Sequence, residues 1–125
     1  MKNTLLILVV IFLLSIAHDS VAQQISQVNM ETVSISKGQQ PAYIINIPNA
    51  DVAVVVKDWE KIIKQNTKSK VEESAGEISI LATQINEIHH APINIYSLIY
   101  KKDTTVRVVA AFEIDSAFFD FGAVE

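Results

Sequence analysis

Two adjacent histidines are the residues of this sequence best suited to chemistry. His89 and His90 follow Glu87 in the stretch EIHHAPINIYS, and imidazole with carboxylate could ligate zinc or copper, or act as a general acid and base. In an extended chain the two imidazoles would point to opposite faces, so one ion could not take both. In a loop both could turn toward a metal, with Glu87 as a third ligand because the chain has no cysteine. We expect His89 and His90 to be semi-exposed structural residues ahead of Pro92, and a metal site stays the alternative.

The motifs of several enzyme classes are absent. The stretch Glu87-Ile88-His89-His90 lacks the HExxH spacing that places two histidines on one helical face. There is no G-x-S-x-G nucleophile elbow. The three glycines are too scattered for a phosphate-binding loop, at Gly38, Gly76 and Gly122.

The acidic pairs do not form an evident acid–base dyad either. Glu72 and Glu73 would point to opposite faces of a strand, and Asp58 and Glu60 are expected on the solvated face of a helix. We therefore expect no catalytic, cofactor-binding or metal-ligating residue and no cofactor. An enzyme is the less favoured hypothesis, although a hydrolase site could be assembled from distant His and Asp or Glu residues.

The N-terminus predicts export. A lysine and the α-amino group precede thirteen residues, Leu5 to Ala17, of which one serine is polar, and Ser20 and Ala22 then occupy the positions that a signal peptidase reads. A membrane anchor would need about 20 apolar residues. We predict a signal peptide at residues 1–22 and a location in the periplasm or the extracellular space.

Residues 23–125 form the expected mature chain, a single α+β domain. Its 103 residues allow one compact domain with a modest core. Loss of Lys2 and Asp19 with the signal peptide leaves the net charge at −4, and a mildly acidic chain argues against nucleic-acid binding. Without cysteine, burial must hold the exported domain together. We expect no transmembrane segment after signal cleavage.

Alternating apolar residues predict a first hairpin. Val28 to Ile35 and Ala42 to Ile47 are expected to pair around turn residues in segment 36–41. The apolar phase changes midway along the first of these runs. A phase change within one strand predicts a bulge or a break near Glu31-Thr32.

The second half of the chain predicts four further strands. Lys70 to Glu73 and Glu77 to Leu81 flank a tight Ser-Ala-Gly turn, and Thr83 to Pro92 is expected to be irregular. Ile93 to Tyr100 and Val106 to Ile114 show the clearest alternation, so they are expected to form a hairpin around a Lys-Lys-Asp-Thr-Thr turn.

One helix is predicted from an apolar period of 3.6 residues. Its stripe consists of Val52, Val55, Val56, Trp59, Ile62 and Ile63. Asn49 is the expected N-cap, with Asp51 in the first turn, and Trp59 is expected in the core. The order β-β-α-β-β-β-β predicts an α+β fold, a mostly antiparallel sheet with one amphipathic helix packed on one face.

Three phenylalanines lie in the last stretch, Ser116 to Glu125. Their rings could pack back on the open face of the sheet, or they could begin a second helix whose remainder the chain lacks. A short helix capped by Ser116 would put Phe118 and Phe121 on one side. We expect a short docked segment, with truncation as the alternative.

After the signal peptide, the chain contains SKGQQPAYIINIPNA, DWEKIIK, GEISI, APINIYSLI and VVAAFEIDSAF. In this combination it resembles a group of small exported proteins of unknown function associated with Bacteroidota. The resemblance covers nearly all of residues 23–125 and implies envelope localisation and an α+β domain, without catalytic or binding residues. In that group the turn after the last long strand is glycine-rich and a further helix follows. Here Asp115-Ser116 stands in place of the glycines, as in a shortened member.

The favoured function is a non-catalytic binding or interaction module of the cell envelope, with an envelope protein or a small ligand as partner. It is suggested by the lack of a reactive motif and by an aromatic-rich sheet with Tyr43, Tyr96, Tyr100 and Phe112. A metal-binding protein that uses His89/His90 is the second hypothesis and a small hydrolase the third. An exposed apolar groove would favour the first, a carboxylate beside the histidines the second, and a deep cleft with buried carboxylates the third. The sequence does not indicate an oligomeric state.

Overall fold

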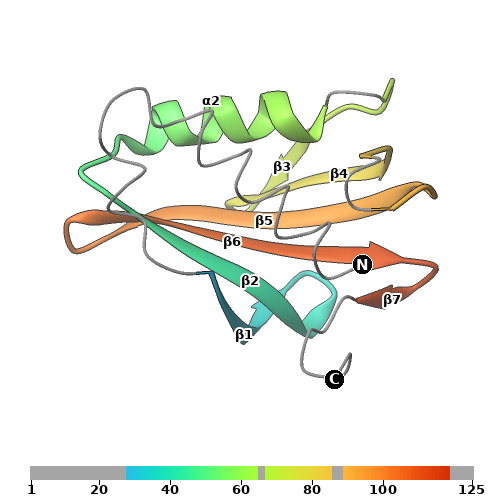
Figure 1. Cartoon of the computed structure of the whole chain (residues 1–125), viewed down its shortest axis with the longest axis horizontal. Helices are drawn as coiled ribbons and strands as arrows, with labels where there is room; N and C mark the ends of the chain where they lie inside the picture. Colours follow the sequence, from blue (N-terminus) through green and yellow to red (C-terminus); the bar gives the residue numbers. More distant parts are fainter. Residues whose placement is uncertain (1–27, 65–66, 86–88, 119–125) are drawn as a thin grey trace.

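A computed structural model describes residues 28–64, 67–85 and 89–118. Within these ranges the chain forms one seven-stranded sheet and one helix (Figure 1). The elements are β1 (Asn29–Ile35), β2 (Gly38–Pro48), α2 (Val52–Ile63), β3 (Glu72–Ser74), β4 (Glu77–Thr83), β5 (Ile93–Lys102), β6 (Thr105–Ile114) and β7 (Ala117–Phe118). The predicted α+β class, a mostly antiparallel sheet with a single helix, is confirmed for these residues. The helix is too short to cross a membrane, and no other described segment is a helix that could do so.

The strand order is β1-β2-β6-β5-β4-β3, with β7 also paired to β6 and every pair antiparallel. β5 follows β6 from Thr105 to Glu113, but β2 pairs with β6 only through Tyr43 to Pro48. β5 occupies one edge of β6 as far as Glu113, so β7 must pair with the other edge of β6, beyond the point where β2 stops pairing with it. The first residues of β2, Gly38 to Ala42, pair with β1 and have no described partner on their other side.

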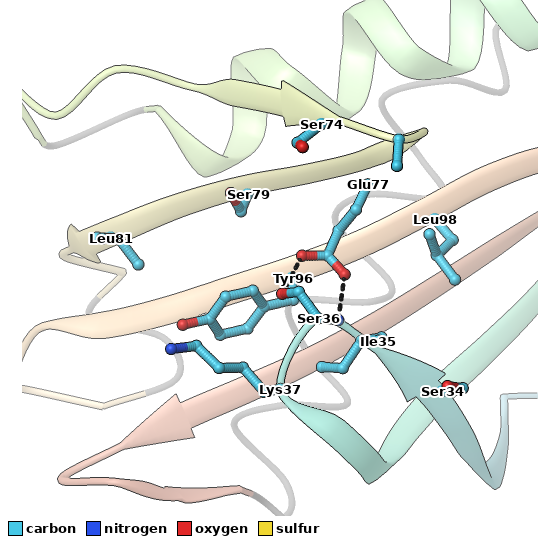
Figure 2. A pocket seen from close by; sticks show the side chains of 11 residues that line it. Ser34, Ile35, Ser36, Lys37, Ser74, Glu77, Ser79, Leu81, Tyr96 and Leu98 are labelled. Carbon is cyan, nitrogen blue, oxygen red and sulfur yellow. Dashed lines mark hydrogen bonds between the residues drawn. The ribbon is translucent and has the colours of Figure 1, made fainter.

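This arrangement lets the β1–β2 hairpin bend across the sheet face that lies away from α2. β1 and β4 are separated by three strands in the sheet order, yet Ser36 in the hairpin turn hydrogen-bonds to Glu77 at the start of β4 (Figure 2). The sheet therefore curls, and the hairpin tip covers part of its concave face.

β2 begins earlier than predicted. The expected turn at residues 36–41 is reduced to Ser36 and Lys37, because Gly38 takes the left-handed φ of +91° that ends the turn. Pro41 then lies inside the strand. A proline has no N–H to donate to a ladder, and it is accommodated here because this part of β2 has no β6 neighbour.

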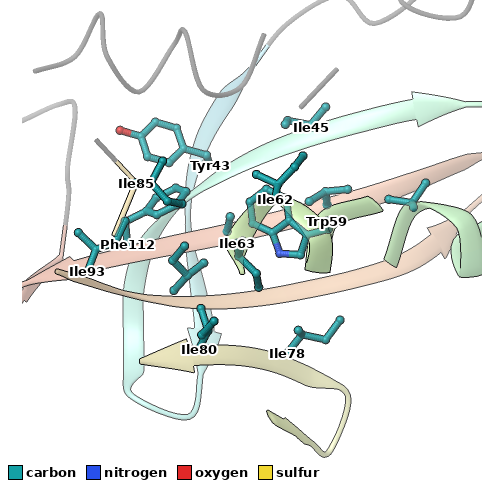
Figure 3. Close-up of a cluster of buried hydrophobic side chains, with 14 of the residues drawn as sticks. Tyr43, Ile45, Trp59, Ile62, Ile63, Ile78, Ile80, Ile85, Ile93 and Phe112 are labelled. Atoms are coloured by element: carbon teal, nitrogen blue, oxygen red, sulfur yellow. The ribbon is translucent and has the colours of Figure 1, made fainter. Parts of the chain in front are cut away.

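Long apolar side chains fill the space between the sheet and α2 (Figure 3). We call this cluster the helix-side core. It contains Tyr43, Ile45, Ile47, Val55, Trp59, Ile62, Ile63, Ile78, Ile80, Ile85, Ile93, Ile95, Val106, Val108, Ala110, Phe112 and Ile114. The predicted helical stripe is confirmed, since four of its members are buried and Val52 and Val56 pack against the same cluster. Burial of one such side chain contributes about 1.5–3 kcal/mol, which outweighs the lower helix propensity of valine.

Two buried polar contacts fix α2 on β4 and β5. Trp59 Nε1 donates to Ser97 Oγ at 2.7 Å, and Ser97 Oγ donates to the Ile78 carbonyl at 3.1 Å. Thr83 Oγ1 donates to the Ile63 carbonyl at 2.6 Å, which satisfies a carbonyl of the last helical turn. Ser97 and Thr83 are fully buried. Because a buried group without a partner costs about 1–3 kcal/mol, these contacts specify one position for the helix.

The start of α2 differs from the prediction. Asp51 is the N-cap residue rather than part of the first turn, and its side chain makes no capping hydrogen bond. Asn49 adopts a left-handed φ of 55°, which asparagine tolerates, and its N–H donates to the Thr104 carbonyl at 3.2 Å. Asn49 thus ties the loop before the helix to the β5–β6 turn and does not cap α2.

The bulge predicted near Glu31-Thr32 is wrong, because β1 pairs with β2 in one unbroken register. The apolar phase changes because both faces of the sheet are covered. Val28 and Met30 pack against the helix-side core, whereas Val33 and Ile35 belong to a cluster on the opposite face.

We call this second cluster the inner cluster, because it lies on the concave face. Its buried members are Ile35, Ala42, Ile44, Tyr96, Val109 and Ala111, with Val33, Leu98 and Phe118 partly buried beside them. Two of its buried members, Ala42 and Ala111, are small, which leaves room for Ile44 and the ring of Tyr96.

The remaining turns lie where they were predicted, but the strands beside them begin or end at other residues. Ala75 and Gly76 both have positive φ, 52° and 84°, as a two-residue β-hairpin turn requires, and β3 is the short strand Glu72–Ser74. β4 extends to Thr83 and shifts register between Ile80 and Thr83. The irregular segment that follows contributes Ile85 to the helix-side core.

The C-terminal prediction is partly wrong. Ser116 does not cap a helix, because Asp115 and Ser116 form a tight turn with φ of 53° and 68° and Ala117–Phe118 pairs with β6. Phe118 packs on Tyr96 with 5.8 Å between ring centroids, so this ring does return to the inner face. Phe119, Phe121 and the predicted signal peptide at residues 1–22 lie outside the described residues.

The left-handed turn at Asp115-Ser116 generates a stability prediction. A non-glycine residue in this conformation is strained by about 1 kcal/mol, so Ser116→Gly is expected to raise the free energy of unfolding by about that amount. The measurement is chemical denaturation. Ser34→Gly is the matched control. Ser34 lies in extended β1, where glycine has more backbone freedom to lose on folding, so this variant is expected to be less stable than the wild type. A loss of stability in Ser116→Gly would contradict the turn conformation.

Candidate functional site

A hollow of about 460 Å³ opens on the concave side of the sheet (Figure 2). The tip of the β1–β2 hairpin forms one wall, and β4 with the β3–β4 turn forms the other. Its lining residues are Ser34, Ile35, Ser36, Lys37, Ser74, Ala75, Glu77, Ser79, Leu81, Tyr96 and Leu98. This volume is in the range of small-molecule sites, about 300–1,000 Å³.

Two hydrogen bonds between Ser36 and Glu77 join the walls, and we call this pair the clasp. The Ser36 N–H donates to Glu77 Oε1 at 2.9 Å, and Ser36 Oγ donates to Glu77 Oε2 at 2.6 Å. Both are charge-assisted bonds with the short distances that an ionised acceptor favours. The clasp holds the hairpin tip over the inner cluster, and the hollow lies beside it.

Tyr96 forms the floor of the hollow. Its ring is buried, with Phe118 on it and the Lys37 ammonium 5.9 Å from the ring centroid. Its hydroxyl donates to Glu113 Oε1 at 3.2 Å. Burial raises the pKa of Tyr96 to about 12, helped by the charge of Glu113, the hydrogen bond to it and the charge of Glu77. The phenol is therefore neutral and fixed at physiological pH.

The walls combine charged, hydroxyl and apolar groups. Lys37 supplies a cation and Glu77 a carboxylate, while Ser74 and Ser79 share the face of Glu77. Leu81 is 53% exposed, a high value for a large apolar side chain. Such a set can orient a ligand by hydrogen bonds and cover its apolar part.

Among the described lining residues of the hollow, Ser36 Oγ donates to the Glu77 carboxylate, and no serine is paired with a histidine. His89 and His90 do not line it.

The histidine pair lies in a loop at a different place. The His89 and His90 rings stack with centroids 4.4 Å apart. His89 Nδ1 accepts the Ala91 N–H at 3.0 Å, and the His90 carbonyl accepts from Gln84 at 3.2 Å. These contacts shape the approach to β5, and His89 is partly exposed and His90 exposed.

No group of three or more His, Cys, Asp or Glu side chains lies together in the part of the chain that the structure describes. Glu87, the proposed third ligand, lies outside that part. Because the Ala91 N–H occupies His89 Nδ1, the other ring nitrogen of His89 would have to be its ligand atom.

The aromatic residues of the sheet do not share one surface. Tyr43 and Phe112 pack together in the helix-side core, with 5.7 Å between their ring centroids. Tyr96 belongs to the inner cluster, and Tyr100 is exposed. Trp59 is buried in the core, as predicted.

The acidic pairs have mixed outcomes. Glu72 and Glu73 are exposed on β3. Asp58 and Glu60 are only partly exposed, so the expected fully solvated helix face is wrong there, and Asp58 Oδ2 is buried without a hydrogen-bond partner among the described residues. None of the four lines the hollow of about 460 Å³.

The sequence did not single out Lys37, Glu77, Ser79 or Leu81 as site residues. Ser36-Lys37-Gly38 predicts a turn, and GEISI predicts a strand, so each segment was placed correctly. The contact between them joins residues 41 positions apart, and no local pattern reveals it.

The raised pKa of Tyr96 generates a prediction on pH. Because about 12 exceeds the ordinary 10.0 of tyrosine, the folded state favours the neutral phenol. This contribution to stability is fully present below pH 10 and is lost as the pH rises from 10 toward 12. Denaturant unfolding at about pH 9 and about pH 11.5 is expected to show that loss in the wild type and a smaller one in Tyr96→Phe.

Tyr100→Phe is the matched control, since it removes an exposed phenol and should leave the alkaline loss in place. Equal losses in the wild type and in Tyr96→Phe would contradict the burial and the Glu113 contact.

Comparison with known proteins adds no relative to this picture, since no protein-family model, no curated protein and no solved structure matches the chain.

Proposed function

We propose that residues 23–125 form an exported, non-catalytic binding module of the cell envelope, and that the hollow beside the clasp is its binding site. The observation that carries the proposal is the hollow itself, a concavity of about 460 Å³ built from two distant segments. It offers a cation, a carboxylate, hydroxyls and an exposed leucine on one surface.

The rigidity of the floor supports a binding role. Tyr96 is held by Glu113, whose carboxylate also accepts from Asn94 Nδ2 at 2.9 Å. The clasp fixes the opposite wall. A site whose parts are ordered before the ligand arrives loses less entropy on binding.

Export is supported by the N-terminal pattern alone. The apolar run is shorter than a membrane span, and small residues follow it at the expected cleavage positions. The domain that follows needs no disulfide, because two apolar clusters and two buried polar contacts stabilise it.

The proposal is tested by expressing the full chain in a Gram-negative host and recovering it from the periplasm. Its intact mass is expected to correspond to a chain beginning at Gln23. The recovered protein, labelled with ¹⁵N, is then titrated with the small-molecule fraction of an envelope extract. Amide shifts are expected around the hollow, at Lys37, Ser79 and Leu98.

A filled hollow provides the matched comparison. Ser79→Phe places a ring in the hollow and should abolish these shifts, whereas Thr104→Phe places the same ring in the exposed β5–β6 turn and should preserve them. Shifts that centre on His89 and His90, or that persist in Ser79→Phe, would overturn the assignment of the site. A chain that stays in the cytoplasm with residues 1–22 still attached would contradict export.

A further inference from the structure

We infer that the hollow takes a small zwitterion with an aliphatic arm, the chemical class of the neutral aliphatic α-amino acids. This inference rests on the proposed binding function and assigns the class of its ligand. It is carried by the placement of Lys37, Glu77 and Leu81 around the ring of Tyr96.

The two charges of the hollow have opposite sign and come from opposite walls. Lys37 belongs to the hairpin tip and Glu77 to β4, and in Figure 2 their side chains lie on either side of Tyr96. A ligand with one charge would be attracted by one of them and repelled by the other. A ligand with both charges can be attracted by both.

Each charged group keeps hydrogen-bonding capacity for a ligand. A carboxylate has about four lone-pair sites, and the clasp uses one on each oxygen of Glu77. The remaining sites suit an ammonium group. The Lys37 ammonium has three donors, which suit a carboxylate.

The aliphatic arm is indicated by Leu81. This side chain lies at the register shift of β4, where Ala82 takes a left-handed φ of 57° and its N–H donates to Asn94 Oδ1 at 2.8 Å. Bulges of this kind often re-aim a side chain beside a site. Here the irregularity presents a 53% exposed leucine at the rim of the hollow. An apolar arm would cover this side chain, whereas a polyol would not.

Three matched probes test the class: L-leucine, 4-methylpentanoate, which lacks the ammonium group, and 3-methylbutylamine, which lacks the carboxylate. Each is titrated by NMR into the ¹⁵N-labelled chain recovered from the periplasm. Leucine is expected to bind at least about tenfold more tightly than either analogue, with shifts at Lys37, Ser79 and Leu98.

Single variants should remove this advantage selectively. Lys37→Gln is expected to make leucine and the amine equal, because the partner of the carboxylate is lost. Glu77→Gln is expected to make leucine and 4-methylpentanoate equal, while its amide oxygen still accepts from Ser36. Leu81→Ser should weaken all three probes alike.

Lys101→Gln and Glu73→Gln are the controls, since both residues are exposed and do not line the hollow. They should leave leucine binding unchanged, and thermal unfolding of every variant identifies any that fails to fold. The comparison of the three probes on the wild type does not depend on the variants.

Equal affinity for the three probes would overturn the zwitterion class. If leucine does not bind while the envelope extract still shifts the hollow, the class is wrong and the binding function stands. If neither leucine nor the extract shifts the hollow, both proposals fail.

Discussion

The concave side of the structure depends on the bend of the β1–β2 hairpin, whose tip contacts β4 through Ser36 and Glu77 across the two intervening strands, β6 and β5. Apolar packing supports the same bend, because Ile35 is buried in the inner cluster and Val33 packs beside it. The bend covers part of the concave face, buries the inner cluster and gives the hollow its second wall. The bend of the hairpin therefore accounts for both the packing of one sheet face and the presence of a candidate site.

The two faces of the sheet are packed differently. The helix side takes large residues and is fixed by directional bonds, such as that between Trp59 and Ser97. The concave side holds a smaller cluster, in which Ala42 and Ala111 are fully buried. Tyr96 is its largest buried member. Its ring supports the hairpin tip, and its hydroxyl reaches Glu113 at the margin of the cluster.

Local patterns predicted most of the elements because their causes are local. The stripe around Trp59 and the alternation of β5 and β6 were confirmed, since period and face are set within a few residues. The bulge in β1 was predicted wrongly because an apolar phase change was attributed to one buried face, whereas both faces are covered. Asn49 was assigned to a cap, but its backbone bonds to Thr104, a partner that the sequence does not reveal.

The candidate site was not predictable in the same way. The reactive-looking pair His89-His90 shapes a loop, whereas the hollow is built from residues that look ordinary one by one. Lys37 reads as a turn residue and Glu77 as the first residue of a strand. They come together because β2 bends between Gly38 and Ala42, the part of the strand that does not pair with β6.

Hydrogen exchange at the Ser36 amide tests the closure of the sheet most directly. Because this N–H donates to Glu77 Oε1, we expect it to be protected in the wild type and to exchange rapidly in Glu77→Ala. The Asn49 amide, which donates to the Thr104 carbonyl, should stay protected in both proteins. Rapid exchange of Ser36 in the wild type, or protection that survives in Glu77→Ala, would contradict the account.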